Sequence, residues 1–149
     1  MSYRNVRPVR IDKKWGHELC VVTKHAPKGA VGYSGKILTV KQGWQSSIHY
    51  HIDKTETFFI LEGKLILELY RHKLEVPAVA KAPRPITMDD VRLELSTVLE
   101  PGQGMTLDPL TPHRFWALSL DGCKFVEFST PDDPADSYRI TQSGPRANE

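Results

Sequence analysis

Short runs of strand-forming residues, set apart by proline and glycine, are the feature that most constrains the fold of this chain. The runs are rich in Val, Ile, Leu, Phe and Thr, and comprise Lys36–Lys41, Ser46–His51, Thr55–Leu61, Lys64–Tyr70, Met105–Leu107 and Lys124–Ser129. Short strands at this spacing are typical of antiparallel sandwiches and barrels. No long helical stripe interrupts them, and only Met88–Leu95 is compatible with either a helical turn or a strand. The sequence therefore predicts an all-β fold.

The length of the chain fits a single domain over residues 1–149. A chain of 149 residues can bury a sizeable core without disulfides or metal ions as staples. Residues 11–140 are expected to form this core domain. Segment 73–87 contains three prolines and is interpreted as a long loop, either a surface excursion or a cover over a site. The polar residues 142–149 are expected to be a disordered tail.

Composition excludes several classes of partner. The formal net charge is +2 and the basic residues are scattered, which argues against binding to nucleic acid. No apolar run approaches the roughly 20 residues that a membrane-spanning helix needs. The first residues contain no apolar signal-peptide core, so we expect cytoplasmic residence. Two cysteines, Cys20 and Cys123, make no disulfide framework.

The run Thr55–Leu61 has apolar side chains on both faces of the expected strand. Successive side chains of a strand point to opposite faces, so Phe58 and Phe59 face opposite ways. A sheet whose outer face met only water would alternate more cleanly between polar and apolar residues. Either a second sheet or a second subunit is therefore expected to cover this face, and we favour a homodimer.

The strongest chemical signal is a pair of histidines followed by a glutamate. His49 and His51 are separated by one residue, which places both imidazoles on one face of a strand. Glu56 follows after a turn, so a neighbouring hairpin strand brings its carboxylate beside them. Two imidazoles and one carboxylate suit manganese, iron, cobalt, nickel or zinc. Manganese is our first expectation among these divalent ions.

His113 is the candidate for a further metal ligand. It follows Thr111 and Pro112, after a turn at 100–102 and the short run Met105–Leu107. Three histidines and one glutamate leave coordination positions open for water or substrate, as a catalytic metal requires. The competing interpretation is a polar cluster satisfied by hydrogen bonds alone, which would be costly to bury.

These residues resemble the two motifs of the cupin superfamily. The segment Gly43–Gly63 matches the first motif at every defining position, with its glycines, His-x-His pair and glutamate. In the second motif, Gly102 and His113 stand where the family has its glycine and histidine. The departures from that motif lie in the turn and beyond the ligand, at Asp108, Leu110 and Ala117. The resemblance implies a single-domain antiparallel jelly-roll β-barrel with a metal site at His49, His51, Glu56 and His113.

Three further segments resemble sugar-phosphate isomerase cupins of the type II mannose-6-phosphate isomerase group. They are Lys14–Glu18, Lys36–Lys41 and the C-terminal stretch that runs from Glu127 to Arg139. The resemblance implies a metal-dependent aldose–ketose isomerase that acts on a sugar or sugar phosphate through a cis-enediol. Alternatives are an iron-dependent cupin dioxygenase and a non-catalytic cupin that binds a sugar or a metal, because cupins host many reactions.

Four residues outside the metal motif are candidates for roles with a sugar substrate. Glu127 shares a strand face with Phe125, so it is expected inside the barrel as the general base, or alternatively as a core ion pair. Lys36, Lys41 and Arg139 are candidates for substrate binding. Solvation is the alternative for at least one of the lysines, and a structural ion pair is the alternative for Arg139.

Overall fold

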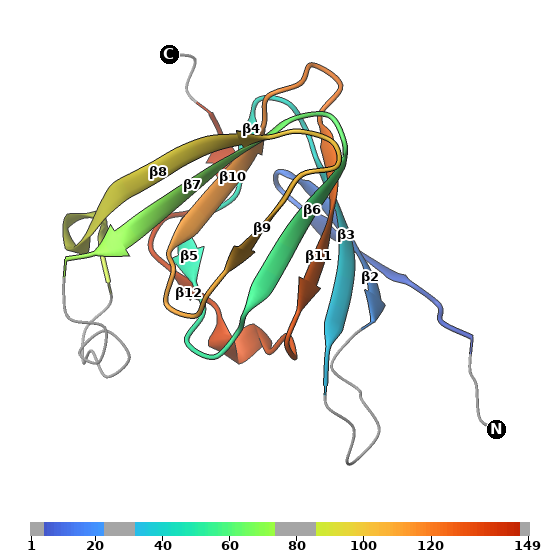
Figure 1. The fold of residues 1–149 in the computed structure, drawn as a ribbon, viewed down its shortest axis with the longest axis horizontal. Coiled ribbons are helices and arrows are strands. Elements are labelled where there is room, and N and C mark those ends of the chain that lie inside the picture. Colours follow the sequence, from blue (N-terminus) through green and yellow to red (C-terminus); the bar gives the residue numbers. More distant parts are fainter. Residues whose placement is uncertain (1–4, 23–31, 74–85, 147–149) are drawn as a thin grey trace.

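Two antiparallel sheets pack face to face in the computed structural model, which describes residues 5–22, 32–73 and 86–146 (Figure 1). The all-β prediction is confirmed. The six-stranded sheet has the order β1 (Val9–Lys13), β2 (Gly16–Val22), β3 (Ser34–Val40), β11 (Cys123–Ser129), β6 (Glu56–Glu62) and β9 (Gly104–Leu107). Every pair of neighbouring strands in it is antiparallel.

The second sheet has seven strands and carries the two histidine segments. Its path is β12 (Tyr138–Arg139), β5 (His49–Tyr50), β10 (His113–Ala117), β4 (Trp44–Gln45) and β13 (Gly144–Pro145), and β10 also pairs with β7 (Leu65–His72), which pairs with β8 (Val91–Leu99). Two short 3-10 helices, η1 (Met88–Asp90) and η2 (Pro134–Asp136), complete the described structure. No helix within the described ranges is long and apolar enough to cross a bilayer.

The interior between the sheets changes from polar to apolar along the strands. In β6, Glu56 faces inward at one end, and the inward positions that follow are Phe58 and Ile60, which are almost fully buried. Strand β11 shows the same change from Glu127 to Phe125. Burying an aromatic or aliphatic side chain of this size contributes about 1.5–3 kcal/mol. The apolar end therefore forms the core, and the polar end is free to form a site.

Aromatic rings fill the core directly beneath that polar end. The ring of Phe58 lies 5.0 Å from the ring of Phe125 between centroids, and Phe115 lies 5.3 Å from Phe125 in an edge-to-face arrangement. Phe58 also contacts the ring of His113, with centroids 5.9 Å apart. Edge-to-face pairs of this kind add to the free energy gained from burial alone.

A second, smaller apolar cluster covers the outer side of the seven-stranded sheet. It contains Ile48 and Tyr50, which alternate along the chain with His49 and His51 and so point away from the barrel interior, as the alternation predicts. The ring of Tyr50 stacks on Tyr138 with centroids 5.3 Å apart. The strand that carries the histidine pair is therefore fixed from behind.

The described structure corrects the prediction for the C-terminal segment and shows both alternatives within the ambiguous segment Met88–Leu95. Residues 142–146, expected to be disordered, include β13, which pairs with β4, and the guanidinium of Arg146 stands 3.7 Å from the centroid of the Trp116 ring. Local polarity suggested disorder, but contacts with distant strands hold this segment. The ambiguous Met88–Leu95 contains both expected elements, η1 followed by β8. Of the expected loop 73–87, residues 74–85 lie outside the described residues.

Candidate active site

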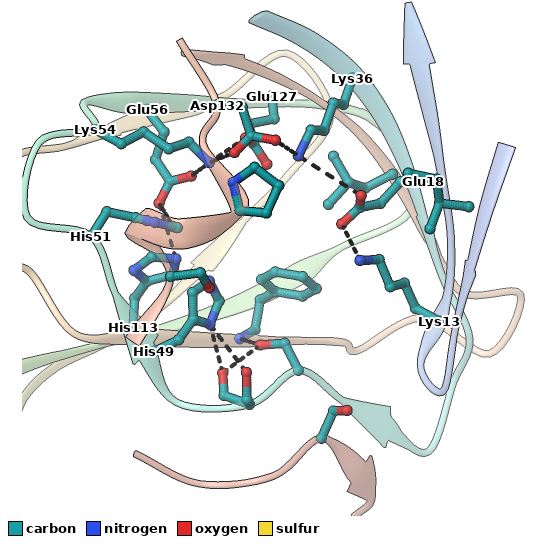
Figure 2. A pocket seen from close by; sticks show the side chains of 18 of the residues that line it. Lys13, Glu18, Lys36, His49, His51, Lys54, Glu56, His113, Glu127 and Asp132 are labelled. Carbon is teal, nitrogen blue, oxygen red and sulfur yellow. Dashed lines mark hydrogen bonds and ion pairs between the residues drawn. The ribbon is translucent and has the colours of Figure 1, made fainter. Parts of the chain in front are cut away.

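A cavity of about 490 Å³ opens between the two sheets at their polar end. Its seven-stranded wall carries His49, His51 and His113, and its six-stranded wall carries Glu56 and Glu127 (Figure 2). A cavity of this size is in the range that holds small-molecule ligands. The predicted metal ligands and the predicted general base therefore share one cavity.

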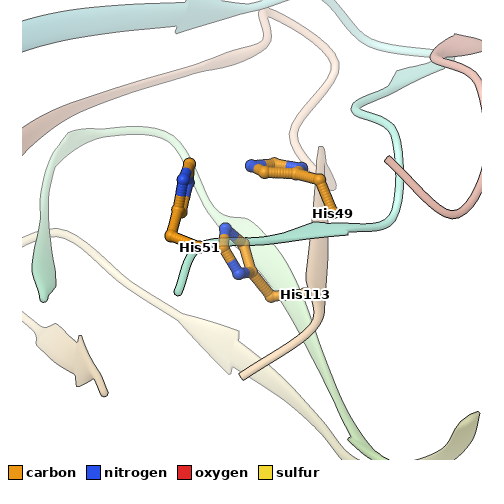
Figure 3. Close-up of side chains that lie close together, drawn as sticks. All are labelled: His49, His51 and His113. Atoms are coloured by element: carbon orange, nitrogen blue, oxygen red, sulfur yellow. The ribbon is translucent and has the colours of Figure 1, made fainter. Parts of the chain in front are cut away.

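The three histidines come together from two neighbouring strands (Figure 3). His49 in β5 is the direct cross-strand partner of His113 in β10, and His51 follows β5. One ring nitrogen from each of the three lies within 4.8 Å of the others. The ring centroids of His49 and His113 are 4.4 Å apart. This three-histidine group could hold a divalent metal ion.

Backbone carbonyls orient all three imidazoles. Nδ1 of His49 lies 3.1 Å from the carbonyl oxygen of Ser47, and Nδ1 of His113 lies 3.0 Å from that of Thr111. Nδ1 of His51 bonds to the carbonyl oxygen of Asp136. A carbonyl oxygen can only accept a hydrogen bond, so each Nδ1 donates and each Nε2 is left with its lone pair. This is the arrangement usual for metal-ligating histidines.

The electrostatics of the histidine group fit a bound cation. Burial lowers the pKa of His113 and lowers that of His49 well below its usual range, so both rings are neutral and keep their lone pairs. Nε2 of His113 is buried and makes no hydrogen bond within the described structure. A buried imidazole nitrogen without a partner is costly, and a metal ion would satisfy it.

Glu56 lies beside the three histidines rather than within their compact group. Its Oε1 is 3.1 Å from Nε2 of His113 and 3.8 Å from Nε2 of His51, while its Oε2 is 2.8 Å from Nζ of Lys54. Burial raises the pKa of this carboxyl, but His113 and Lys54 outweigh burial and lower it to about 2. Glu56 is therefore ionised near neutral pH, with one oxygen directed at the histidines, and its role as a ligand stays a prediction.

Lys54 is the main residue of the site that the sequence reasoning missed. Its ammonium group is buried and bridges the two carboxylates, 2.8 Å from Glu56 and 2.7 Å from Glu127, with Asp132 at 3.4 Å. The short segment before β6 suggested a solvated turn. However, Lys54 has the same parity as Glu56 and Phe58, and this parity was the available signal that it faces inward.

Glu127 lies on β11 between Lys36 of β3 and Phe58 of β6, which are its cross-strand partners. Its carboxyl group is buried and bonds to Nζ of Lys54. Burial raises the pKa of Glu127, the nearby charge of Glu56 raises it further, and the two lysines only partly oppose this. A buried carboxyl group with a raised pKa is suited to accept and return a proton near neutral pH.

The charged network continues from Lys54 through Asp132 and Lys36 to Glu18 (Figure 2). Asp132, a second residue missed from the sequence, lies 2.5 Å from Lys36, which is 3.8 Å from Glu18. Burial lowers the pKa of Lys36, but Glu127 and Glu18 outweigh this effect and raise it overall. The predicted substrate residue Lys36 therefore lines the cavity as part of an ion-pair chain.

The other two predicted substrate residues occupy different places. Arg139 lines the cavity and is the direct cross-strand partner of His49 in the pair of β12 with β5. Lys41 is not among the residues that line the cavity, and its ammonium group stands 4.7 Å from the centroid of the Trp44 ring. The fold thus brings Arg139, but not Lys41, to the predicted metal site.

Comparison with known proteins gives one family and a set of similar folds. The family model of D-lyxose isomerase matches residues 20–148. No curated protein sequence matches the chain.

The similar solved structures are cupins. The capsular polysaccharide assembling protein CapF from Staphylococcus aureus is 14% identical with a TM-score of 0.67, and the match covers 91% of this chain and 34% of CapF. Oxalate decarboxylase from Lactobacillus farciminis is 14% identical with a TM-score of 0.66, covering 94% of this chain and 37% of that one. Oxalate decarboxylase from Bacillus subtilis is 14% identical with a TM-score of 0.67, covering 94% and 33%.

This chain spans about a third of the length of those structures, and at such identities the likeness concerns the fold alone. The predicted cupin assignment is confirmed. The matched family is D-lyxose isomerase, an aldose–ketose isomerase family, which is the reaction class that the resemblance implied, and the finer resemblance to the type II mannose-6-phosphate isomerase group stays a prediction. Because the family model matches nearly the whole chain, this protein belongs to the D-lyxose isomerase family of cupin-like sugar isomerases.

Proposed function

We propose that this protein is a metal-dependent aldose–ketose isomerase, with D-lyxose as the first substrate to test. The observation that carries the proposal is the meeting, in one cavity, of an open three-histidine group and a buried carboxyl group with a raised pKa. An isomerase of this type needs both features, because it must stabilise negative charge on substrate oxygens and move a proton between two carbons.

The three histidines would hold the ion, with Glu56 alongside. A divalent ion bound there supplies a Lewis acid for the carbonyl and adjacent hydroxyl oxygens of the sugar. The neutral imidazoles suit this task because no positive charge on the ligands opposes the ion. Manganese is the ion we propose, since nitrogen and oxygen donors accept it and the fold is similar to that of Bacillus subtilis oxalate decarboxylase, which has Mn(II) centres.

Glu127 is the proposed proton carrier between C1 and C2 of the sugar. Its raised pKa lets it take a proton from one carbon and return it to the next by way of a cis-enediol. Lys54, which bonds to its carboxylate at 2.7 Å, holds the group in place and balances its charge. Glu56 is less suited to this role, because a carboxylate with a pKa of about 2 is a weak base that would not hold the transferred proton.

Lys36 and Arg139 are the proposed contacts for sugar hydroxyl groups away from the reacting carbons. Both line the cavity, one on each sheet. Lys41 has no place in this proposal because it lies outside the cavity lining.

We also propose that the protein is a homodimer and that it resides in the cytoplasm. The outer face of the six-stranded sheet carries a stripe of direct cross-strand neighbours, Leu19, Ile37, Val126 and Phe59. Phe59 is 40% exposed, and Phe128, on the same face, is 56% exposed. Charges of both signs border the stripe, at Arg10, Asp12, Glu62 and Lys124. A second copy related by a two-fold axis can oppose unlike charges across the stripe.

The dimer is tested by measuring the mass of the protein in solution by light scattering. We expect a dimer for the wild type and a monomer for Phe59→Glu. Leu95→Glu, on the exposed strand β8 of the other sheet, is the control and should remain dimeric. A monomeric wild type would disprove this part of the proposal.

The isomerase is tested with protein from which metal has been removed and then restored with manganese. D-Lyxose and a panel of other aldoses and ketoses are incubated with and without chelator, and the products are separated by chromatography. We expect chelator-sensitive interconversion, which Glu127→Gln abolishes and Glu62→Gln, at an exposed position on β6, leaves intact. Absence of interconversion across the panel would refute the proposal, and substrate-dependent oxygen uptake would favour a dioxygenase instead.

A further inference from the structure

The segment that follows β11 runs along the turn between His51 and Glu56. We name residues 130–136 the clamp, and the turn it contacts comprises residues 51–55. The clamp is more than 70 residues away from the turn in the sequence, yet it bonds to the turn at both ends. Asp136 makes three of these contacts and Thr130 makes another three.

Asp136 bonds to three consecutive residues of the turn. Its carboxylate accepts hydrogen bonds from the backbone amides of Ile52, at 2.7 Å, and Asp53, at 3.0 Å. Its carbonyl oxygen accepts the bond from Nδ1 of His51. The same residue therefore fixes the backbone of the turn and the orientation of a proposed metal ligand.

The helix η2 holds Asp136 itself in place. The backbone amide of Asp136 bonds to the carbonyl oxygen of Asp133 at 2.9 Å, and the Asp133 side chain caps η2 by accepting a bond from the amide of Ala135. Asp136 therefore makes one hydrogen bond within the capped helix and three hydrogen bonds to the turn at 51–55, so its position is fixed from both sides. A residue fixed in this way holds its partners within narrow limits.

The other end of the clamp holds the turn close to Lys54. The amide of Thr55 donates to Oγ1 of Thr130 at 3.1 Å, and the amide of Thr130 donates to the carbonyl oxygen of Thr55, also at 3.1 Å. Between these ends, Asp132 lies 3.4 Å from the ammonium group of Lys54. His51 and Lys54, three residues apart, are therefore held by one continuous piece of chain.

We propose that Asp136 is a positioning residue that sets His51 and Lys54 relative to each other, and so couples the metal site to the proton-transfer site. The link to catalysis rests on the proposed function, whereas the effect on His51 does not. Without the Asp136 carboxylate, the amides of Ile52 and Asp53 lose their acceptors and the turn relaxes. The carbonyl of residue 136 then no longer holds the His51 ring in its Nδ1–H tautomer.

The test compares Asp136→Ala with Asp136→Asn, which retains one of the two side-chain acceptor oxygens, and with Asp121→Ala, at an exposed turn position, as the control. Zinc, a diamagnetic stand-in for manganese, is titrated into each metal-free protein by calorimetry. We expect Asp136→Ala to weaken zinc binding by about 10- to 100-fold, the range usual for residues that orient metal ligands, with Asn in between and the control unchanged.

A spectroscopic readout separates positioning from simple structural support. Nitrogen-15 spectra of the histidine rings report which nitrogen of His51 carries the proton, in the metal-free and the zinc-loaded protein. We expect the Nδ1–H form in the wild type and a mixture of tautomers in Asp136→Ala, at temperatures where both proteins are folded. An Ala variant that keeps wild-type zinc affinity and the wild-type tautomer would overturn the proposal.

The experiments distinguish a wrong proposal about Asp136 from a wrong proposal about the function of the protein. If the wild type binds no zinc or manganese and isomerises no sugar, the proposed function fails, and the tautomer in the metal-free protein still decides the clamp. If the wild type is an active isomerase, we expect Asp136→Ala to lower kcat more than it raises KM, because Asp136 acts on Lys54 and His51. Equal kcat in both proteins would contradict the coupling.

Discussion

The two walls of the cavity are built differently. On the seven-stranded wall, backbone carbonyls orient the histidines, and burial keeps His49 and His113 neutral. On the six-stranded wall, carboxylates and a lysine are paired as ions. A cation site needs lone pairs without competing positive charge, so neutral imidazoles held by neutral acceptors suit it. Proton transfer needs groups whose charge can change, and a balanced network lowers the cost of burying them. The two proposed tasks would thus fall largely on different sheets, with Glu56 the one proposed metal ligand that comes from the six-stranded sheet.

The largest effect is expected when a histidine of the seven-stranded wall is replaced, and the affected quantity is metal binding. We expect His51→Ala to weaken metal binding by more than about 100-fold, beyond the range for residues that only orient ligands, and to leave most of the fold intact. His17→Ala, on β2 and outside the cavity lining, is the control. Elemental analysis after dialysis measures the retained metal. Unchanged metal content in the His51 variant would show that the ligand assignment is wrong.

Replacing Lys54 should damage the other wall without removing the metal. In Lys54→Met the carboxylates of Glu56 and Glu127 lose the cation between them. We expect kcat to fall by about 10²- to 10⁴-fold, and the free energy of unfolding to fall by about 3–5 kcal/mol, the cost of breaking a buried ion pair. Enzyme kinetics and urea denaturation measure the two effects.

The control for Lys54 is Lys64→Met, at a half-exposed lysine paired with Glu100 at 2.6 Å. A surface pair of this kind contributes about 0–1 kcal/mol, so this variant should be nearly neutral. Loss of metal in proportion to the loss of activity in Lys54→Met would break the proposed separation of the two walls.

Acid should destabilise the two walls over different pH ranges. The lowered pKa values of His49 and His113 mean that the unfolded chain binds protons on them below the ordinary value of 6.5 and the folded protein does not, so stability falls as the pH drops below 6.5. The pKa of Glu56 is lowered from 4.5 to about 2, so its contribution, about 3 kcal/mol, is present above pH 4.5 and is lost between 4.5 and 2.

Urea denaturation of metal-free protein at pH 7.5, 5.5 and 3.5 measures this difference. His113→Asn should flatten the decline between pH 7.5 and 5.5, and Glu56→Gln should flatten the decline at lower pH. Glu127, whose pKa is raised partly by Glu56, contributes with the opposite sign, so Glu56→Gln also reduces the Glu127 contribution, whereas His113→Asn leaves the Glu56 charge in place. The same pH profile for both variants would contradict the separation.

The smallest effect is expected on KM, from replacing Lys36, which the sequence analysis grouped with Lys41 as a candidate for substrate binding. Lys36→Met removes a cation that lines the cavity, so we expect KM for the sugar to rise by about tenfold, the equivalent of one hydrogen bond of about 1.4 kcal/mol. Lys41→Met, outside the cavity lining, should leave KM unchanged. Equal effects of the two substitutions on KM would remove Lys36 from the proposed substrate contacts.

Strand alternation and motif spacing predicted much of the fold and much of the cavity. The period-2 pattern placed His49, His51, Glu56 and Glu127 on inward faces, and the cavity lining includes all four. These predictions succeed because the face of a residue in a strand is set by local sequence.

The residues that sequence reasoning missed depend on long-range contacts. Lys54 and Asp132 lie next to strands whose separation in the chain is large, and their pairing follows from sheet register rather than local pattern. Arg146 is ordered by Trp116 for the same reason. A turn-like or polar segment looks alike in sequence whether it meets solvent or a distant strand.

Phe58, Phe115 and Phe125 form an aromatic floor that closes the inner end of the cavity. Glu127 is the cross-strand partner of Phe58, so a proton on its carboxyl group has hydrocarbon beneath it. If the protein is the proposed isomerase, the proton can reach bulk water only by way of the cavity or the Lys54 ammonium group, which slows its exchange during a turnover. A hydrogen isotope placed at C2 of the sugar should then be found, in part, at C1 of the product.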